Sequence, residues 1–204
     1  PSGNEIIYVT WNDLEKGTIS YLDINEGEPV KLTTEKAIYR TPSYSKDAKQ
    51  IVYRKQAVNT DQGITFTKNP GIYVMDQDGQ NPTKITNYGE NPMFNNDGSR
   101  IYLQTGGTYF GSLTKKLISV NLQGHDEREH VISKYANHIV PSPDNKWVAF
   151  TNLHKAYIAP MPQIGKPLTL DGKSNNVPVQ QIAKDAGVNL HWSSNSNTIM
   201  WTLG

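Results

Sequence analysis

The feature of this sequence that most limits its possible folds is a phrase that returns about every 50 residues. The four copies begin at residues 43, 93, 140 and 191 and read SYSKDAKQIVYRKQ, MFNNDGSRIYLQTG, VPSPDNKWVAFTNL and HWSSNSNTIMWTLG. Aligned on Ser45, Asn95, Ser142 and Ser193, the copies are separated by 50, 47 and 51 residues. An internal period of this length is typical of repeat folds, in which each repeat is one structural unit.

Each repeat has the pattern of four short strands. In every copy a polar turn separates a short apolar run from a run of β-branched and aromatic residues, as in a β-hairpin. A second pair of such runs follows, for example GIYVMD from Gly71 and PTKIT from Pro82, separated by the turn QDGQN. With no convincing helical periodicity in the chain, this pattern predicts an all-β fold: a β-propeller segment built of four-stranded antiparallel blades.

The register of the repeat predicts about four blades that are incomplete at both ends. Ile6 aligns with Ile51, so the first blade lacks its first strand, and the sequence ends just after a second strand. Within one propeller domain or fragment, the expected units are residues 1–40, 41–90, 91–137 and 138–188, with a partial unit at 189–204. We therefore expect a segment of a larger propeller, or a propeller that closes with an irregular seam.

Composition excludes several classes of function. Lys plus Arg number 20 against 19 for Asp plus Glu, and a net charge of +1 gives no electrostatic basis for binding nucleic acid or anionic lipid. The absence of cysteine excludes disulfides and thiolate chemistry. The longest apolar runs are far shorter than the roughly 20 residues of a membrane-spanning helix, so no transmembrane segment is expected. The opening PSGNEIIYV shows no signal peptide.

The connections between strands differ on the two sides of each predicted blade. Those after the first and third strands are short and uniform, whereas those after the second strand and between blades vary. Variable loops on a rigid scaffold often carry recognition, so we expect a binding site on this side. The alternative is that these loops only tolerate insertion. Tyr109 and Phe110, in a glycine-rich loop, are predicted to contact a partner, as is the loop at residues 58–69.

A column of polar residues stands at the start of the predicted inner strands. Inner-strand starts approach the central channel of a propeller, so these side chains are candidates to line a site for a ligand or an ion. The alternative is an ordinary polar channel whose groups are satisfied by water. The candidate channel-lining residues are Thr41, Asn91, His138 and Asn189, with His191 two residues further along its strand.

No catalytic or metal-binding motif occurs in the sequence. None of the five histidines forms H-x-H or H-E-x-x-H, and there is no G-x-S-x-G nucleophile elbow. We interpret Asp76, Asp78, Asp97 and Asp144 as turn formers rather than calcium ligands. We therefore expect no catalytic, cofactor-binding or metal residue in this chain, and the sequence leaves open whether the whole protein is an enzyme.

Aromatic residues recur at strand positions of the repeats. Burial of one aromatic side chain removes roughly 150–250 Å² from water, worth on the order of 4–6 kcal/mol as an upper bound. This magnitude favours a place in the core over a role as a binding platform. The residues concerned are Trp11, Trp147, Trp192, Trp201, Tyr8, Tyr53 and Tyr102.

Three phrases, VPSPDNKWVAFTN, GIYVMDQDGQNPTKIT and NPMFNNDGSRIYLQ, resemble TolB-like, WD-like propeller repeats. The likeness covers nearly the whole chain, although one copy has NND where SPDG is usual and the last reads SSNSN. Residues 147–204 are similar, more narrowly, to the propeller that precedes an amidohydrolase domain in bacterial proteins. In that family the catalytic barrel performs metal-dependent hydrolysis of amide-like bonds, and its metal-ligand motifs are absent here.

The resemblance implies a non-catalytic scaffold or substrate-gating domain of a larger, bacterial hydrolase. Its partner would be a C-terminal catalytic domain of the same protein, and its location the periplasm or the secreted fraction. The alternative is a protein–protein interaction module of TolB type, whose partner is another protein. A weaker alternative is binding of a small ligand or glycan at the propeller channel. None of these requires a cofactor in this chain.

Overall fold

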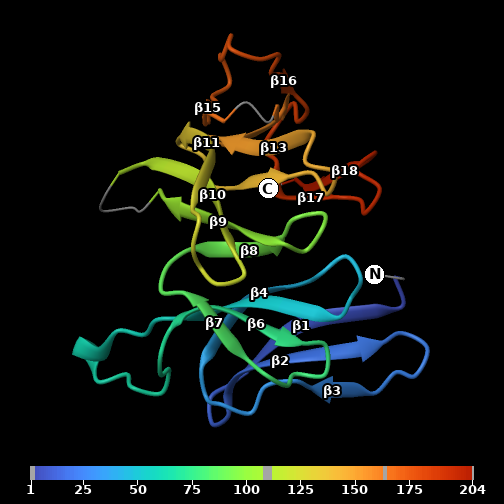
Figure 1. Ribbon diagram of the computed structural model, residues 1–204, viewed down its shortest axis with the longest axis vertical. Helices are drawn as coiled ribbons and strands as arrows, with labels where there is room; N and C mark the ends of the chain where they lie inside the picture. The colour runs from blue at the N-terminus through green and yellow to red at the C-terminus, as the bar shows by residue number, and fades with distance from the viewer. Residues whose placement is uncertain (1–2, 108–111, 163–164, 204) are drawn as a thin grey trace. The chain divides into compact units, whose positions relative to one another are not determined.

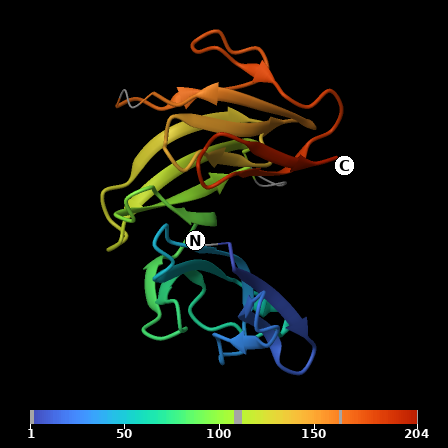
Figure 2. The same cartoon turned by 90° about the vertical axis from the view of Figure 1, so that its right-hand side faces the viewer.

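The computed structural model describes residues 3–107, 112–162 and 165–203, and β-strands dominate it. The helical element in these ranges is a single 3₁₀ turn, Thr60–Gln62, and they contain no α-helix. Most sheets are built from consecutive strands, so the colour in Figures 1 and 2 passes from blue in the first sheet to red in the last. The all-β prediction is therefore confirmed.

The strands form five sheets, which we call blades 1 to 5 in chain order. Blade 1 contains β1 (Glu5–Asn12), β2 (Lys16–Asp23) and β3 (Pro29–Lys31). Blade 2 contains β4 (Ile38–Tyr44), β5 (Gln50–Gln56), β6 (Gly71–Asp76) and β7 (Thr83–Thr86). Blade 3 contains β8 (Glu90–Phe94), β9 (Arg100–Gly106), β10 (Thr114–Asn121), β11 (Arg128–Lys134) and β15 (Leu168–Thr169). Blade 4 contains β12 (Ile139–Pro141), β13 (Trp147–Asn152), β14 (Lys155–Pro160) and β16 (Gln180–Gln181), and blade 5 contains β17 (Val188–Trp192) and β18 (Ile199–Thr202).

The turn that marks the sequence repeat forms the same hydrogen bonds in several copies. Ser45 Oγ donates to Asp47 Oδ1 at 2.7 Å and accepts from the Gln50 amide at 3.0 Å. Ser142 and Ser193 make the equivalent pair of bonds in their own turns. Short polar side chains that bond nearby backbone stabilise tight turns, so the repeated phrase encodes a hairpin. Each of these turns also has one residue with left-handed backbone: Ala48, Gly98, Asn145 and Ser196.

One strand leaves the blade to which its place in the sequence would assign it. β15 follows β14 in the chain, yet it pairs in parallel with β11 of blade 3 through Val131–Leu168 and Ile132–Thr169. The outer place in blade 4 is taken instead by β16, which pairs with β14. The spacing of the repeat does not predict this exchange.

The chain divides into two compact units, each with its own core. Unit 1 comprises residues 1–103 with 121–125, and unit 2 comprises residues 104–120 with 126–204. In unit 1, Ile19 of blade 1 packs in one buried cluster with Ile51 and Met75 of blade 2. In unit 2, Phe150 is fully buried and its ring stacks on Tyr157 at 5.5 Å. No helix in the described ranges is long and apolar enough to cross a membrane.

Candidate functional site

The polar column of the inner strands falls in both units. Thr41 and Asn91 lie in unit 1, and His138, Asn189 and His191 lie in unit 2. Thr41, Asn91 and Asn189 share a left-handed backbone, with φ of 45°, 47° and 53°. The strand register shifts at Thr41 and at Asn189, as it does at a β-bulge. The repeat thus places a bulge at this position, and the channel-lining role of these residues stays a prediction.

Polar side chains next to this column form an ion pair and hydrogen bonds that stabilise the blades. In unit 1, Arg54 of blade 2 forms an ion pair with Glu90 of blade 3 at 2.7 Å. In unit 2, Thr151 Oγ1 accepts hydrogen bonds from the amides of Asn137 and His138 at 2.9 and 3.0 Å. The bonds to Thr151 satisfy two backbone amides just before β12. Backbone amides need such partners in any stable fold, so these bonds serve the stability of the blade.

His138 is held in its neutral form. Its pKa is lowered first by burial and then by the positive charge of Lys115 and by His191. Lys115 is itself buried, and its Nζ donates to the carbonyl oxygen of Asn137 at 3.0 Å. A cation beside His138 disfavours a second positive charge, so the imidazole is neutral at neutral pH.

A serine–histidine hydrogen bond occurs in blade 3, but its geometry is not that of a catalytic pair. Ser119 Oγ lies 2.7 Å from His130 Nε2. Ser119 is only 1% exposed and lies on β10, so a substrate has no access to its hydroxyl. The contact joins two neighbouring strands. Within the described ranges no group of three or more His, Asp or Glu side chains is arranged to hold a metal ion.

The aspartates of the turns are engaged by neighbouring hydroxyls and amides. Asp97 Oδ1 accepts from both the amide and the hydroxyl of Ser99, and Asp144 Oδ1 accepts from Ser142 and from the Lys146 amide. These hydrogen bonds lower the pKa of both carboxyls. The geometry is that of turn formers, in agreement with the interpretation from the sequence.

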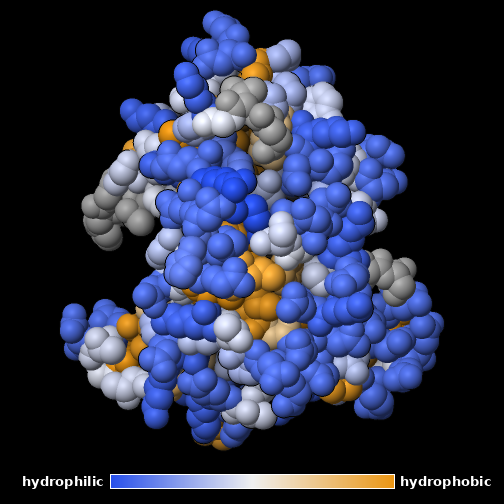
Figure 3. All heavy atoms as spheres, viewed as in Figure 1, coloured by the Kyte–Doolittle hydropathy of each residue, from blue (hydrophilic) through white to orange (hydrophobic). Residues whose placement is uncertain are grey.

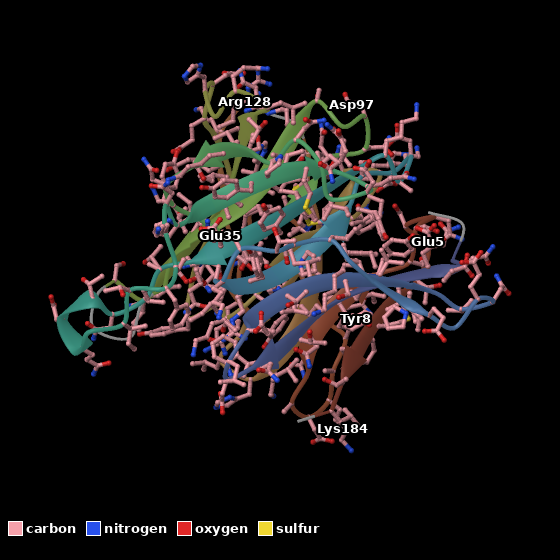
Figure 4. The ribbon with its side chains drawn as sticks, turned by 90° about the horizontal axis from the view of Figure 1, so that it is seen from below. Glu5, Tyr8, Glu35, Asp97, Arg128 and Lys184 are labelled. Carbon is pink, nitrogen blue, oxygen red and sulfur yellow. The ribbon has the colours of Figure 1, made fainter. Side chains whose placement is uncertain are left out.

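A buried lysine fastens the segment between blades 1 and 2. Lys55 of β5 is 5% exposed, and its Nζ lies 2.6 Å from Glu35 Oε2 and 5.5 Å from the centre of the Tyr73 ring. The Tyr39 hydroxyl donates to the Glu35 carbonyl. Burial, with a smaller contribution from Glu35, raises the pKa of Tyr39 to about 12. Glu35, labelled in Figure 4, therefore has a structural role: it neutralises a buried charge.

The first exposed cluster on the variable-loop side lies in unit 1 and is called the Trp11 cluster (Trp11, Leu14, Lys16 and Phe66). Trp11 is 52% exposed and Leu14 is 77% exposed. The Trp11 and Phe66 rings lie 6.1 Å apart, and Lys16 Nζ lies 5.8 and 5.0 Å from their centres. Asp13 accepts from Trp11 Nε1 at 2.9 Å and fixes the indole. The prediction that Trp11 belongs to the core is wrong, because it stands at the end of β1 beside the turn.

The second exposed cluster lies in unit 2 and is called the Tyr135 cluster (Leu113, Lys134, Tyr135 and Leu153). Three of its residues expose large apolar side chains: Leu113 at 45%, Tyr135 at 41% and Leu153 at 57%. Consecutive backbone hydrogen bonds of 3.1 Å join Tyr135 to Leu113 and Leu153 to Tyr135. Lys134 Nζ lies 4.9 Å from the centre of the Tyr135 ring. Both clusters thus pair exposed apolar groups with a lysine over an aromatic ring.

Other sequence predictions have mixed outcomes. Tyr53, Tyr102 and Trp192 are buried as expected, whereas Trp147 is 41% exposed, because it is the first residue of β13. Tyr109 and Phe110 lie outside the described residues. On the face drawn in Figure 3 most of the surface is hydrophilic, with hydrophobic residues reaching it in patches of different size.

Comparison with known proteins gives a clear result for the fold. No family model and no curated protein matches the sequence. Among solved structures, TolB from Acinetobacter baumannii matches 97% of this chain and 46% of its own, with a TM-score of 0.64 and 19% identity. The chain has a TolB-like β-propeller fold. This confirms the fold class and the likeness seen in the repeats.

Two further structures agree with the TolB-like fold. A putative TolB from Agrobacterium tumefaciens matches 89% of this chain and 61% of its own, with a TM-score of 0.61 and 20% identity. An oligogalacturonate lyase in complex with manganese matches 98% of this chain and 58% of its own, with a TM-score of 0.60 and 12% identity. The chain spans about half of the length of these structures. Because an oligogalacturonate lyase and TolB both match this propeller fold, the fold alone does not assign a reaction.

Proposed function

We propose that this TolB-like propeller is a protein-interaction module that binds another protein through its variable-loop side. The propeller fold fits a scaffold or interaction module. The observation that carries the proposal is the presence of exposed apolar residues in the connections that vary between repeats, in the Trp11 cluster and again in the Tyr135 cluster.

The chemistry of both clusters suits a protein interface. Tryptophan and tyrosine are enriched among the residues that dominate binding energy, and exposed apolar groups gain most when a partner covers them. Lys16 and Lys134 lie over aromatic rings, which limits the motion of those rings before a partner binds. By contrast, polar groups near the inner strands are engaged by one another, in the Arg54–Glu90 ion pair between blades 2 and 3 and in the hydrogen bond from the Asn137 amide to Thr151.

Affinity capture with defined variants tests this proposal. We expect Trp11→Ala combined with Leu14→Ser to release a protein that the wild-type chain retains, as measured by quantitative mass spectrometry. Ile24→Ser is the matched control, because Ile24 is 53% exposed but lies in the uniform turn after β2. The proposal fails if both loop-side clusters can be substituted without changing the set of retained proteins.

A second proposal is that the propeller belongs to a bacterial hydrolase and gates or supports a catalytic barrel encoded outside this sequence. The similarity of residues 147–204 to propellers that precede amidohydrolase domains supports it. A periplasmic or secreted location follows from the same resemblance and is part of this proposal. Extending the reading frame past Gly204 tests it directly: an H-x-H motif in a (β/α)-barrel pattern is expected. Metal-dependent amidase activity of the present chain by itself would contradict it.

A further inference from the structure

The two units carry net charges of opposite sign, which the near-neutral total of the chain conceals. Unit 1 contains 11 Lys or Arg and 13 Asp or Glu, whereas unit 2 contains 9 Lys or Arg and 6 Asp or Glu. The net charge is therefore −2 in unit 1 and +3 in unit 2, which together give the +1 of the whole chain. A small total charge thus leaves room for a local electrostatic attraction, and the places of the charges in unit 2 decide what it attracts.

Two lysines of unit 2 belong to the surface of the Tyr135 cluster. Lys134 is the last residue of β11 and Lys155 is the first residue of β14, and both are exposed. Asn152 connects them, because its Nδ2 donates to the Lys134 carbonyl oxygen at 2.9 Å and it pairs with Lys155 across the hairpin of β13 and β14. Leu153 lies in the turn of this hairpin, and its amide donates to the Tyr135 carbonyl oxygen at 3.1 Å. Both lysines are therefore held close to the exposed apolar residues of the cluster.

A third lysine comes from the connection between β16 and β17. Lys184, labelled in Figure 4, is exposed in this connection. The Gly187 amide of the same connection donates to the carbonyl oxygen of His154 at 2.9 Å, and His154 is the neighbour of Leu153. Among the described residues, none of the three lysines forms an ion pair with a carboxylate. We call this surface of unit 2 the basic loop surface (Lys134, Tyr135, Leu153, Lys155 and Lys184).

Most acidic residues of unit 2 lie outside the connections that form the basic loop surface. Asp185 is the one carboxylate in the connections at residues 135–138, 153–154 and 182–187. Two of the others are engaged in ion pairs, Asp126 with Arg128 and Glu129 with Lys116. The five acidic residues outside these connections are Asp126, Glu127, Glu129, Asp144 and Asp171. Three lysines against one carboxylate therefore give the basic loop surface a positive charge.

The equivalent connections of unit 1 do not have this excess of positive charge. The turn between β1 and β2 contains Asp13 and Glu15 next to Lys16. The connection between blades 1 and 2 contains Glu35 next to Lys36. An acidic partner would meet like charges at the Trp11 cluster, which is unfavourable. Charge therefore distinguishes the two exposed clusters, although both combine apolar side chains with a lysine over an aromatic ring.

We propose that the partner of the basic loop surface is an acidic segment of another protein, in which large apolar side chains stand among Asp and Glu residues. The proposal rests on the proposed function, because it names the chemistry of the protein bound at the Tyr135 cluster. Tyr135 and Leu153 contact the apolar side chains of the segment, and the three lysines attract its carboxylates. Exposed ion pairs add little affinity each, so the apolar contacts supply most of the binding energy and the charges select the partner.

A protein segment fits this surface better than a nucleic acid or a membrane. Three lysines are fewer than the roughly four to eight basic residues of a typical cluster that binds anionic lipid. They also allow fewer phosphate contacts than the roughly six to ten of a protein that depends on the nucleic-acid backbone. Tyr135 and Leu153 add exposed apolar groups, which contribute little to binding a phosphate backbone but are typical of protein interfaces.

Selection from a library of short random peptides displayed on phage tests the proposal with the 204-residue chain. We expect the selected peptides to be enriched in Asp and Glu, together with Leu, Phe or Tyr, relative to the unselected library. A synthetic copy of the most enriched peptide should bind about fivefold more weakly to Lys155→Gln combined with Lys184→Gln, because two exposed ion pairs are lost. Fluorescence anisotropy measures this affinity. Higher salt should weaken binding to the wild-type chain for the same reason.

Two further variants separate the contribution of charge at this surface from that of charge elsewhere. Lys49→Gln combined with Lys146→Gln is the matched control, because it removes two positive charges from side chains that are 79% and 77% exposed in the uniform turns. It should leave the affinity for the peptide unchanged. Tyr135→Ser combined with Leu153→Ser should weaken binding by at least about tenfold, because the apolar contacts are lost. All of these residues are exposed, so the variants are expected to fold, and circular dichroism checks this.

The proposal is overturned if no peptide is selected, if the selected peptides are not enriched in Asp and Glu, or if the Lys155→Gln and Lys184→Gln variant binds as tightly as the control. A single-stranded oligonucleotide and vesicles of phosphatidylglycerol are the comparison ligands. Binding of either one that exceeds binding of the peptide and requires Lys155 and Lys184 would also overturn it. A captured protein that Tyr135→Ser and Leu153→Ser release, but that binds independently of the lysines, would contradict the acidic partner and still support the interaction module. The two failures are therefore distinguishable.

Discussion

Ile51 in blade 2 and Ile6 in blade 1 are the same residue at the same place in the repeat, yet one is fully buried and the other is half exposed. Both continue into strands of β-branched and aromatic residues, and both strands pair antiparallel with the next strand. What differs is the surface packed against them. The comparison shows that the repeat specifies a blade, whereas the hydrophobic stabilisation of that blade comes from its neighbour, as in other repeat proteins.

The largest expected effect comes from shortening these two side chains. Ile51→Ala should lower the free energy of unfolding by about 3 kcal/mol, because it leaves a cavity in a fully buried cluster. Ile6→Ala should lower it by less than about 1 kcal/mol, because half of the side chain already contacts water. Urea unfolding measures both values. Equal losses would contradict the difference between covered and open blades.

The turn glycines sharpen the same comparison at the backbone. Gly79 and Gly27 both have left-handed backbone, with φ of 84° and 75°, so alanine costs about 1 kcal/mol at either site. Gly79→Ala must in addition displace the Leu32 carbonyl, and a total loss of about 2–3 kcal/mol is expected. Thermal unfolding of the two variants checks the order. A Gly27→Ala variant as unstable as Gly79→Ala would show that the edge of blade 1 is covered.

A smaller effect, of opposite sign, is expected at the inner-strand bulge. Thr41 has a φ of 45°, where a β-branched residue is strained, whereas Asn91 and Asn189 occupy the equivalent position with a residue that tolerates this conformation. Thr41→Asn should therefore stabilise the chain by about 0.5–1 kcal/mol. The reverse change, Asn91→Thr, is the matched control and should destabilise by a similar amount. A neutral result for both would mean that the bulge relaxes without cost.

The smallest expected effect concerns pH and compares His138, which is half-buried, with His125, which is exposed. The pKa of His138 is lower in the folded chain than its usual value of 6.5. The unfolded chain therefore binds the proton first as pH falls, and folding stability should decrease below pH 6.5. His138→Gln should reduce the difference in melting temperature between pH 7 and pH 5. His125→Gln is the control, and an equal reduction there would contradict the assignment to His138.

The sequence by itself determined the units of the fold. The repeated turn around Ser45, Ser142 and Ser193 is closed by hydrogen bonds within six residues, so its pattern is local and visible in the chain. The all-β class and the division into blades follow from this repeated turn. The repeat also places Thr41, Asn91 and Asn189 at one equivalent position, where each has a left-handed backbone. The absence of a catalytic motif stays a prediction from the sequence.

The tertiary structure alone decided which of these similar segments are covered. The transfer of β15 to blade 3 depends on contacts between strands 37 residues apart at Val131 and Leu168. The exposure of Trp11 and Trp147 likewise depends on what packs beside each strand end. The loop clusters also needed the fold, because Leu113, Tyr135 and Leu153 are distant in the sequence and meet only through backbone hydrogen bonds. Each hairpin is encoded by hydrogen bonds between residues that are close in the sequence. The burial of a side chain depends instead on which other surface packs against it, and only the folded structure shows which surfaces those are.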